Sequence, residues 1–349
     1  MYRWAISLAF LAFGAVNAQT ACNGYSEYCS KPYNSLTHVL THNSYGYIAN
    51  PAANQLCPVT TQLADGVRGL KLSAINPSNT TSTAATSQSI YLCHTSCSIL
   101  NAGPAVETLG NVTEWLKNNP NEVLTISWNN LGNFALDAFE AAYNASGILE
   151  YTYTQAVGNL TWPTIQEMIS SGKRVVNFID TGADQSTLPW LLDEFSYVFE
   201  TPYDNRNASS FSCTIDRPSD PSNPTQMMYI MNHFLYGTLT LGSTVIEIPQ
   251  KGTANVTNSE GSLLSQANTC ATTFGRQPNF LEVDFYNLGN TLEIAATLNN
   301  VTYNGAATKC DAYAAQAANT QQGSSEANRI FASSTLLLSM VAATFFVFF

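Results

Sequence analysis

Short apolar runs, separated by polar turns, recur along the central part of the chain and predict strands. They lie at residues 36–40, 66–72, 89–93, 123–128, 175–179, 227–231 and 280–285. Within each run most consecutive positions are apolar, without strict alternation. That pattern is typical of strands that are covered on both faces, as in a parallel sheet.

Amphipathic helical patterns lie between these strands, at residues 105–118, 135–143, 164–170, 263–273 and 291–299. Strands that alternate with helices predict an α/β fold, and their number favours an irregular (β/α)8 TIM-type barrel. No internal repeat divides the chain, so we expect one barrel domain over residues 19–314. In such barrels the chemistry lies where strands end and loops begin.

The beginning of the chain has the pattern of a secretory signal peptide. Arg3 precedes an apolar run over residues 4–16, and the small residues Val16 and Ala18 frame a cleavage site. The run is too short to span a bilayer core of roughly 30 Å. We therefore expect residues 1–18 to be removed during secretion.

The end of the chain carries a second uncharged apolar run, residues 335–349, behind a polar spacer and a small triplet at 323–325. This order is typical of the signal for a glycosylphosphatidylinositol (GPI) anchor. We expect attachment at Gly323 and removal of residues 324–349; a short tail-anchored helix is the alternative. The Ala/Gln/Asn/Ser-rich residues 315–323 predict a stalk that leads to the lipid.

Cysteines and sequons agree with export. The even number of cysteines predicts four disulfides, whose pairing the spacing leaves open; they are Cys22, Cys29, Cys57, Cys93, Cys97, Cys213, Cys270 and Cys310. Seven N-x-S/T sequons predict glycans over the outer surface, at Asn79, Asn111, Asn144, Asn159, Asn207, Asn255 and Asn300. The sequence thus predicts a secreted glycoprotein that is held at the cell surface.

The charge balance narrows the range of partners. The chain has 24 acidic and 13 basic residues, a formal net charge of −11, and argues against nucleic acid as a ligand. No cysteine and histidine spacing typical of zinc occurs, and no cofactor is expected. We expect a monomer whose partners are its substrate and, through the anchor, a membrane.

Two of the four histidines follow predicted strands. His42 comes directly after the run 36–40, and His94 directly after the run 89–93. If both strands belong to one barrel, the two imidazoles lie at the same mouth, where one can take a proton and the other can give one. His38 lies inside a strand and is expected in the core.

The sequence around both histidines resembles a known family. His42-Asn43-Ser44-Tyr45, the run 61–70 and the run 92–97 are similar to motifs of secreted fungal phospholipase C-like phosphodiesterases, of the phosphatidylinositol-specific phospholipase C superfamily. Softer matches occur at 176–180, 193–197 and 279–285. The resemblance covers roughly residues 30–310 and implies the same barrel fold.

The resemblance implies a role for each matched residue. His42 would take the proton of the inositol 2-hydroxyl, which attacks phosphorus, and His94 would protonate the leaving oxygen. Asp284, after the last strand, would orient a histidine and stabilise its imidazolium, as a carboxylate does in catalytic triads. Asn43 would donate a hydrogen bond to a phosphoryl oxygen.

The chain departs from the family at its cation-binding positions. Where active relatives carry an acidic residue, and an arginine or a metal-binding carboxylate, this chain has Lys71 and Ser73, and Asn129 falls near the last calcium ligand. A calcium ion needs several oxygen ligands, preferably anionic, so no metal is expected. Lys71 would supply a point charge to the phosphate, or else pair with a neighbouring carboxylate.

Asn129, Asp180 and His233 each lie at or just beyond the end of a predicted strand and complete the expected substrate-binding set with Asn43 and Lys71. Each of them also has an ordinary structural interpretation, such as a hydrogen bond within a loop.

Two other functions stay open. A catalytically inactive barrel that serves as a cell-wall or adhesion glycoprotein fits the Lys71 and Ser73 departures and the many sequons. A glycosidase would use Glu282 and Asp284, which lie two apart on one strand and share a face, as half of a carboxylate pair. The glycosidase leaves His42 and His94 unexplained.

Overall fold

The computed structural model describes residues 21–77, 86–241, 244–305 and 307–317. The expected signal peptide, the sequon at Asn79, most of the expected stalk, the attachment residue Gly323 and the expected removed tail lie outside these ranges. Within them, no helix combines the length and the apolar character needed to cross a bilayer.

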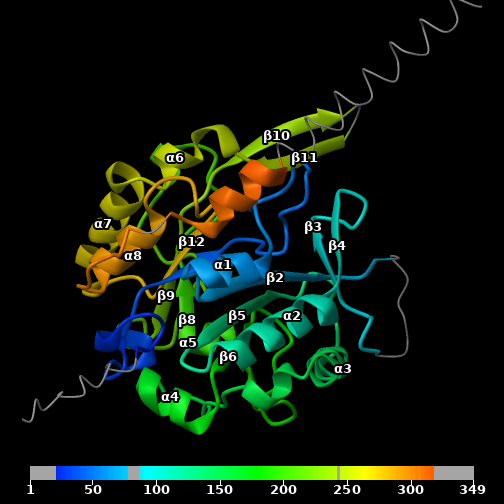
Figure 1. Ribbon diagram of the computed structural model, residues 1–349, viewed down its shortest axis with the longest axis vertical. Coiled ribbons are helices and arrows are strands. Elements are labelled where there is room, and N and C mark those ends of the chain that lie inside the picture. Colours follow the sequence, from blue (N-terminus) through cyan, green and yellow to red (C-terminus); the bar gives the residue numbers. More distant parts are fainter. Residues whose placement is uncertain (1–20, 78–85, 242–243, 306, 318–349) are drawn as a thin grey trace, which may run out of the picture.

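Eight parallel strands form a curled sheet that makes most of a barrel (Figure 1). They are β1 (His38–Thr41), β2 (Gly69–Ile75), β5 (Leu124–Asn129), β6 (Val175–Ile179), β7 (Leu191–Asp193), β8 (Val198–Glu200), β9 (Met228–Asn232) and β12 (Phe280–Val283). Their order is β7-β6-β5-β2-β1-β12-β9-β8, so the first strand pairs with the last, and β7 and β8 stand at the two ends. The predicted TIM-type barrel is confirmed, with an opening between β7 and β8.

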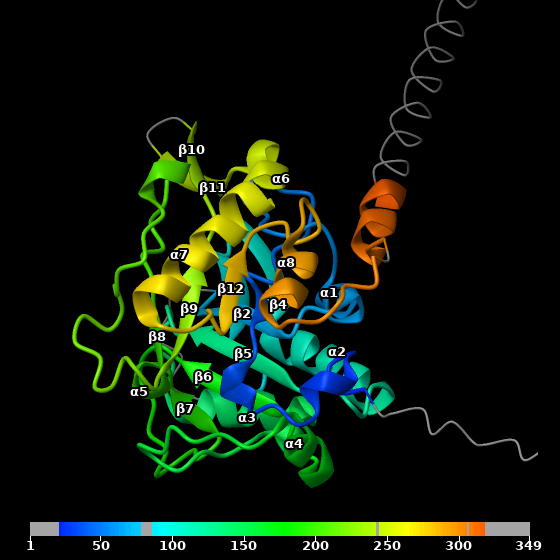
Figure 2. The ribbon, with the colours of Figure 1, turned by 90° about the vertical axis from the view of Figure 1, so that its left-hand side faces the viewer.

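Helices cover the outside of this sheet (Figure 2). They are α1 (Val59–Asp65), α2 (Ala105–Asn118), α3 (Leu136–Ser146), α4 (Ile165–Ser171), α5 (Glu194–Tyr197), α6 (Ala254–Thr257), α7 (Ser265–Phe274) and α8 (Thr291–Leu298). In α2 the buried residues Leu109, Val112 and Leu116 recur at helical spacing and face the sheet, which is why this segment was predictable. Strands β1, β6, β9 and β12 are buried along their whole length, as their continuous apolar runs require.

One predicted strand lies elsewhere than expected. The run 89–93 forms β3 (Tyr91–His94), which is no barrel strand but one arm of an antiparallel hairpin with β4 (Leu100–Pro104). Strand β3 pairs antiparallel with the end of β2, with Leu92 opposite Ala74. The hairpin therefore runs back toward the barrel mouth, and His94 reaches that mouth by this route.

Three further features were not predicted from the sequence. The barrel strands β7 and β8 have three residues each, too few to show a period. A second antiparallel hairpin, β10 (Tyr236–Leu241) with β11 (Thr244–Pro249), follows β9 and extends from the barrel mouth (Figure 1).

All eight cysteines are paired, as expected: Cys22 with Cys29, Cys57 with Cys310, Cys93 with Cys97 and Cys213 with Cys270. The asparagines of the six described sequons are exposed and accessible to glycosylation; they are Asn111, Asn144, Asn159, Asn207, Asn255 and Asn300. The glycans themselves stay a prediction.

The longest disulfide loop is expected to contribute most to stability. Cys57 and Cys310 are 253 residues apart, against 4 for Cys93 and Cys97. By loop-closure entropy, Cys57→Ser with Cys310→Ser should lower the free energy of unfolding by about 5 kcal/mol, and the short-loop pair of serines by about 2 kcal/mol. Urea unfolding of the two double variants measures this, and equal losses would contradict it.

Candidate active site

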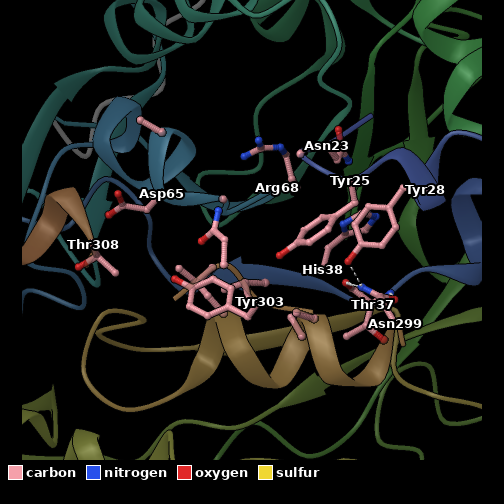
Figure 3. A pocket seen from close by; sticks show the side chains of 18 of the residues that line it. Asn23, Tyr25, Tyr28, Thr37, His38, Asp65, Arg68, Asn299, Tyr303 and Thr308 are labelled. Atoms are coloured by element: carbon pink, nitrogen blue, oxygen red, sulfur yellow. Dashed lines mark hydrogen bonds between the residues drawn. The ribbon is translucent and has the colours of Figure 1, made fainter. Parts of the chain in front are cut away.

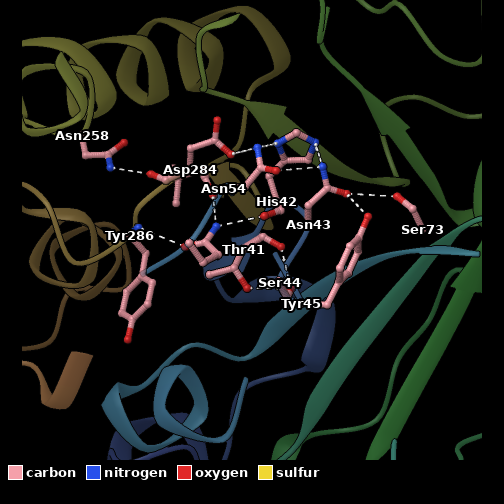
Figure 4. Close-up of polar contacts among 12 residues, drawn as sticks. Thr41, His42, Asn43, Ser44, Tyr45, Asn54, Ser73, Asn258, Asp284 and Tyr286 are labelled. Atoms are coloured by element: carbon pink, nitrogen blue, oxygen red, sulfur yellow. Dashed lines mark hydrogen bonds and ion pairs between the residues drawn. The ribbon is translucent and has the colours of Figure 1, made fainter. Parts of the chain in front are cut away.

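The site forms where the first and the last barrel strands end. Strands β1 and β12 are parallel neighbours with Thr41 opposite Val283, so the next residues, His42 and Asp284, leave the sheet side by side. The Nδ1 atom of His42 lies 2.9 Å from Oδ1 of Asp284 (Figure 4). Two residues that are 242 positions apart in the chain thus form a buried histidine–carboxylate pair.

Side-chain amides fix this pair in one orientation. Asn54 donates to Oδ1 of Asp284 at 2.8 Å, and Gln55 donates to the backbone carbonyl of His42 at 2.9 Å. In the neutral tautomer whose Nδ1 donates a hydrogen bond to the carboxylate, Nε2 is an acceptor, and Asn43 donates to it at 3.1 Å. The ring therefore presents the basic nitrogen that a general base requires.

The residues after all three catalytic candidates have left-handed backbone. Asn43 follows His42 with φ 41°, Thr95 follows His94 with φ 58°, and Phe285 follows Asp284 with φ 47°. Positive φ is uncommon outside glycine and costly for β-branched or bulky residues such as Thr and Phe. Such strained positions concentrate at functional sites, where the surrounding structure holds them in place.

Two opposing effects set the pKa of His42. Burial lowers it, but the charge and hydrogen bond of Asp284, together with the charge of Glu282, outweigh burial and raise the pKa above its usual value. Phe234 stacks on the ring at a centroid distance of 4.1 Å, and Tyr236 meets it edge-on at 6.2 Å. The imidazole is thus held between aromatic side chains and a carboxylate, where a proton on it is stabilised.

Tyr45 connects the two histidine motifs. Its hydroxyl lies 3.0 Å from Oδ1 of Asn43 and 2.7 Å from the carbonyl oxygen of Cys93, the residue before His94. Ser73 also donates to Oδ1 of Asn43, at 3.0 Å. Tyr45 therefore links the loop after β1 directly to the end of β3.

His94 is a neutral imidazole near His42. Burial, and then the charge of His42, lower the pKa of His94 to about 4. The contacts of Tyr45 with Asn43 and Cys93 place the residue after His42 and the residue before His94 at the same end of the barrel. Nδ1 of His94 contacts the hydroxyl of Thr95 at 3.3 Å, whereas no group in the described part of the chain hydrogen-bonds its Nε2.

Lys71 lies inside the barrel among carboxylates. Its Nζ is 3.4 Å from Oε1 of Glu194 and 3.1 Å from Oε1 of Glu200, and the side chain is 2% exposed. Arg217 binds the other oxygen of Glu200 at 2.6 Å and 3.1 Å. The geometry favours the second of the two interpretations of Lys71, pairing with neighbouring carboxylates. Those partners come from α5 and β8, which the sequence pattern did not predict.

This buried network is electrostatically coupled to the catalytic pair through Glu282. Burial raises the pKa of Glu282, against the charges of Lys71 and His42. Burial also raises the pKa of Glu194 to about 8, whereas Lys71 and Arg217 overcome burial and hold the pKa of Glu200 below its usual range. The neighbouring cations therefore favour the charged form of Glu200 more than that of Glu194.

The remaining predicted binding residues have different surroundings. Asn129 lies beside Ser73 at the end of β5, and its buried Oδ1 has no hydrogen-bond partner among the described residues. Asp180 accepts from the backbone of Asn130 at 2.8 Å, and burial raises its pKa. His233 uses both ring nitrogens, on Gln266 and on the carbonyl of Thr257, which leaves neither for a substrate.

A calcium ion does not fit the positions that would hold one in the family. They carry the ammonium of Lys71, the hydroxyl of Ser73 and the amide of Asn129, whereas calcium prefers anionic oxygen ligands. The described residues contain no group of three histidine, cysteine or acidic side chains placed to hold a metal.

A separate cavity of about 270 Å³ lies at the other end of the strands, where β1 and β2 begin (Figure 3). His38, Arg68 and Tyr28 line it. His38 is 6% exposed, and burial, with the charge of Arg68, lowers its pKa to about 3. His38 is therefore a neutral, buried residue, as expected, and lies away from the catalytic pair.

Comparison with known proteins identifies the family. The model of the PI-PLC X family matches residues 28–299, most of the chain. The chain belongs to the PI-PLC X family. The match includes His42, His94 and Asp284 and confirms the resemblance that their motifs indicated. In family and fold the chain therefore resembles phosphodiesterases of the phospholipase C kind.

Two relatives come from the fungus Arthroderma benhamiae. An uncharacterized secreted protein is 37% identical over 297 residues, which cover 81% of this chain and 65% of that protein. PI-PLC X domain-containing protein 1 is 35% identical over 289 residues, which cover 80% of this chain and 90% of the relative. The chain thus spans less than two thirds of the first relative, and most of the second.

A solved structure shows the same fold. A mutant of the phosphatidylinositol-specific phospholipase C from Staphylococcus aureus superposes with a TM-score of 0.52 at 14% sequence identity, over 79% of this chain and 95% of that one. At this identity the likeness concerns the barrel alone.

Several residues of the site were not found from the sequence. Asn54 and Gln55 lie in the loop between β1 and α1, well beyond the end of the strand, and Phe234 and Tyr236 follow β9 without any local signal. Only the pairing of β1 with β12 and the neighbouring hairpin bring them to His42.

Replacing the carboxylate should reverse the pKa shift of His42. In Asp284→Asn the charge is lost while burial remains, so we expect the pKa of His42 to fall below 6.5, the usual value. Proton NMR titration of the imidazole measures this. Asp137→Asn, on the first turn of α3, is the matched control and should leave the titration unchanged. A pKa that stays raised in Asp284→Asn would contradict the electrostatic coupling.

Removal of the buried ammonium should unfold the barrel more easily. Lys71→Met removes the cation beside Glu194 and leaves Glu200 with Arg217 alone, and we expect a loss of about 3–5 kcal/mol at pH 8. The loss should shrink at pH 5, because carboxylates without their cation protonate more readily. Urea unfolding at both pH values measures it, with the exposed Lys117→Met as control. A loss under 1 kcal/mol, or one independent of pH, would argue against the network.

Proposed function

We propose that this chain is a calcium-independent phosphodiesterase that cleaves inositol phospholipids, or closely related phosphodiesters, by general acid and base catalysis with His42 and His94. The observation that carries the proposal is the 2.9 Å contact between His42 and Asp284, with His94 close enough for its pKa to respond to His42. Family membership supports the reaction class.

The first chemical step would use the basic nitrogen of His42. Nε2 takes the proton of the inositol 2-hydroxyl, the oxygen forms a bond to phosphorus, and Asp284 stabilises the imidazolium that results. Asn43, which donates to this nitrogen at 3.1 Å in the free protein, would turn to a phosphoryl oxygen. A cyclic phosphodiester forms as the bond from phosphorus to the glycerol oxygen breaks.

His94 would protonate the leaving glycerol oxygen. Its low pKa leaves it neutral in the free protein. A phosphodiester anion close to the ring favours the charged form and raises the pKa, so substrate binding would itself charge the acid. The unpartnered Nε2 is the nitrogen that would make this contact.

The proposal needs no calcium ion. The donor atoms at Lys71, Ser73 and Asn129 support a site without metal, and stabilisation of the phosphoryl charge would come from Asn43 and the two imidazoles. We also propose that the mature protein is a monomer, held at the cell surface by a GPI anchor at Gly323. The name of the secreted relative supports export.

A second candidate function rests on one observation. Lys71, expected either to face the phosphate or to pair with a carboxylate, lies between Glu194 and Glu200. A barrel without a free cation there fits a catalytically inactive surface glycoprotein. The glycosidase has less support, because Oδ1 of Asp284 contacts His42 and Asn54 and because that function leaves His94 without a role.

Hydrolysis of phosphatidylinositol tests the function. His42→Ala and His94→Ala should each lower kcat/KM by about 10²–10⁴, the range for a lost general acid or base. Activity should be unchanged by EDTA. His38→Gln, which alters a histidine outside the site, is the control and should keep the activity of the wild type.

The possible outcomes separate the candidates. Inertness of the wild type toward inositol phospholipids and glycosylated inositol phospholipids favours the inactive glycoprotein. Loss of activity in EDTA contradicts the metal-free mechanism, and release of sugar from oligosaccharides supports the glycosidase.

A further inference from the structure

A large apolar groove lies beside the catalytic pair. Its volume is about 810 Å³, and its walls come from residues 47–56 after β1, the β10–β11 hairpin after β9, Phe285 after β12, and the helical residues 309–317. Strands β9, β12 and β1 are consecutive neighbours in the barrel, so the groove lies at the same mouth as His42 and Asp284.

Three residues join the groove to the site. Phe285 lines it and directly follows Asp284, and Gln55 lines it while its amide donates to the carbonyl of His42. Tyr236 contacts the ring of His42 edge-on, and the next residue, Gly237, belongs to the groove. The groove therefore borders segments that also contact His42.

The chemistry of the walls selects an apolar ligand. Ile48, Leu56, Ile248, Phe285 and Tyr313 supply most of the large side chains. Among the described lining residues Lys251 alone is charged, and it is exposed. Ile48 is 39% and Tyr313 is 38% exposed, although large apolar groups gain free energy from being covered. The volume lies within the roughly 300–1,000 Å³ of small-molecule sites.

The direction of the chain points to a lipid. Ala317 lines the groove, and the proposed anchor residue Gly323 follows it by six residues, a span of at most about 22 Å when extended. With the proposed anchor at Gly323, the groove would lie on the side of the barrel near the membrane. An acyl chain that rises from a bilayer would meet this side first.

We propose that the groove binds an acyl chain of the lipid substrate while its phosphodiester lies between His42 and His94. This inference rests on the proposed phosphodiesterase function and narrows its substrate to acylated lipids. The groove would make hydrolysis depend on chain length even for single lipid molecules in solution, where no membrane surface contributes to binding.

Short-chain phosphatidylinositols below their critical micelle concentration test this dependence. From dibutyroyl to dihexanoyl lipid, kcat/KM should rise by roughly fourfold for each methylene that enters the groove, the value for burial of one methylene. Glycerophosphoinositol, which has the headgroup and no acyl chain, should be the poorest substrate. Equal kcat/KM across the series would overturn the inference and leave the phosphodiesterase standing.

Two groove variants and one control locate the effect. Ile248→Asn makes a wall polar, and Gly237→Leu fills space. A Cβ at position 237 would meet its nearest neighbours at an ordinary 3.8 Å, so the fold should accept it. Both should flatten the dependence on chain length. Val157→Ser removes an apolar side chain that is 76% exposed outside the groove and should keep the dependence. A dependence that survives in both groove variants overturns the proposal.

Binding without turnover separates failure of the groove from failure of the chemistry. Calorimetric titration of His42→Ala with dihexanoyl phosphatidylinositol should show binding that Ile248→Asn, added to it, weakens at least tenfold. Absence of hydrolysis in every wild-type assay would refute the proposed function, whatever binds. Two results would refute the acyl site alone: binding that Ile248→Asn leaves unchanged, or a dimer in sedimentation experiments that Ile248→Asn dissociates.

Discussion

The parallel pairing of β1 with β12 is the contact on which the site depends. It joins the first barrel strand to the last, and its register puts the residues after Thr41 and Val283 next to each other. The imidazole of His42 and the carboxylate of Asp284 then meet without any further movement of the chain. The sheet is open between β7 and β8, and the pairing of β1 with β12 lies in its continuous part.

Charge inside the barrel is arranged in two connected groups. One is the pair of His42 and Asp284, and the other is Lys71 with Glu200 and Arg217. Glu282, buried on β12, interacts electrostatically with both groups. Buried charges cost free energy unless each has a partner, and here the partners come from strands that are distant in the sequence. Lys71, which departs from the family pattern, therefore belongs to this interior network.

The mouth of the barrel combines a polar centre with an apolar flank. Histidines and side-chain amides surround the expected position of the phosphate, and the groove begins beyond Tyr236. A lipid with an anionic headgroup has the same division, and the two halves of the proposed site match it. The hairpin β10–β11 and the C-terminal helical segment contribute apolar walls to the groove. Both lie outside the eight barrel strands.

The sequence by itself determined the local features of this protein. Continuous apolar runs predicted six of the eight barrel strands, His42 and His94 stood out because they follow strands in a chain with few histidines, and the cysteines were rightly expected to pair. Tertiary structure alone decided the partners. The antiparallel course of β3, the carboxylates around Lys71, the amides of Asn54 and Gln55 and the groove all depend on contacts between residues far apart in the chain. A local pattern of apolar and polar residues records which positions are buried, but it carries no information on which distant segment buries them.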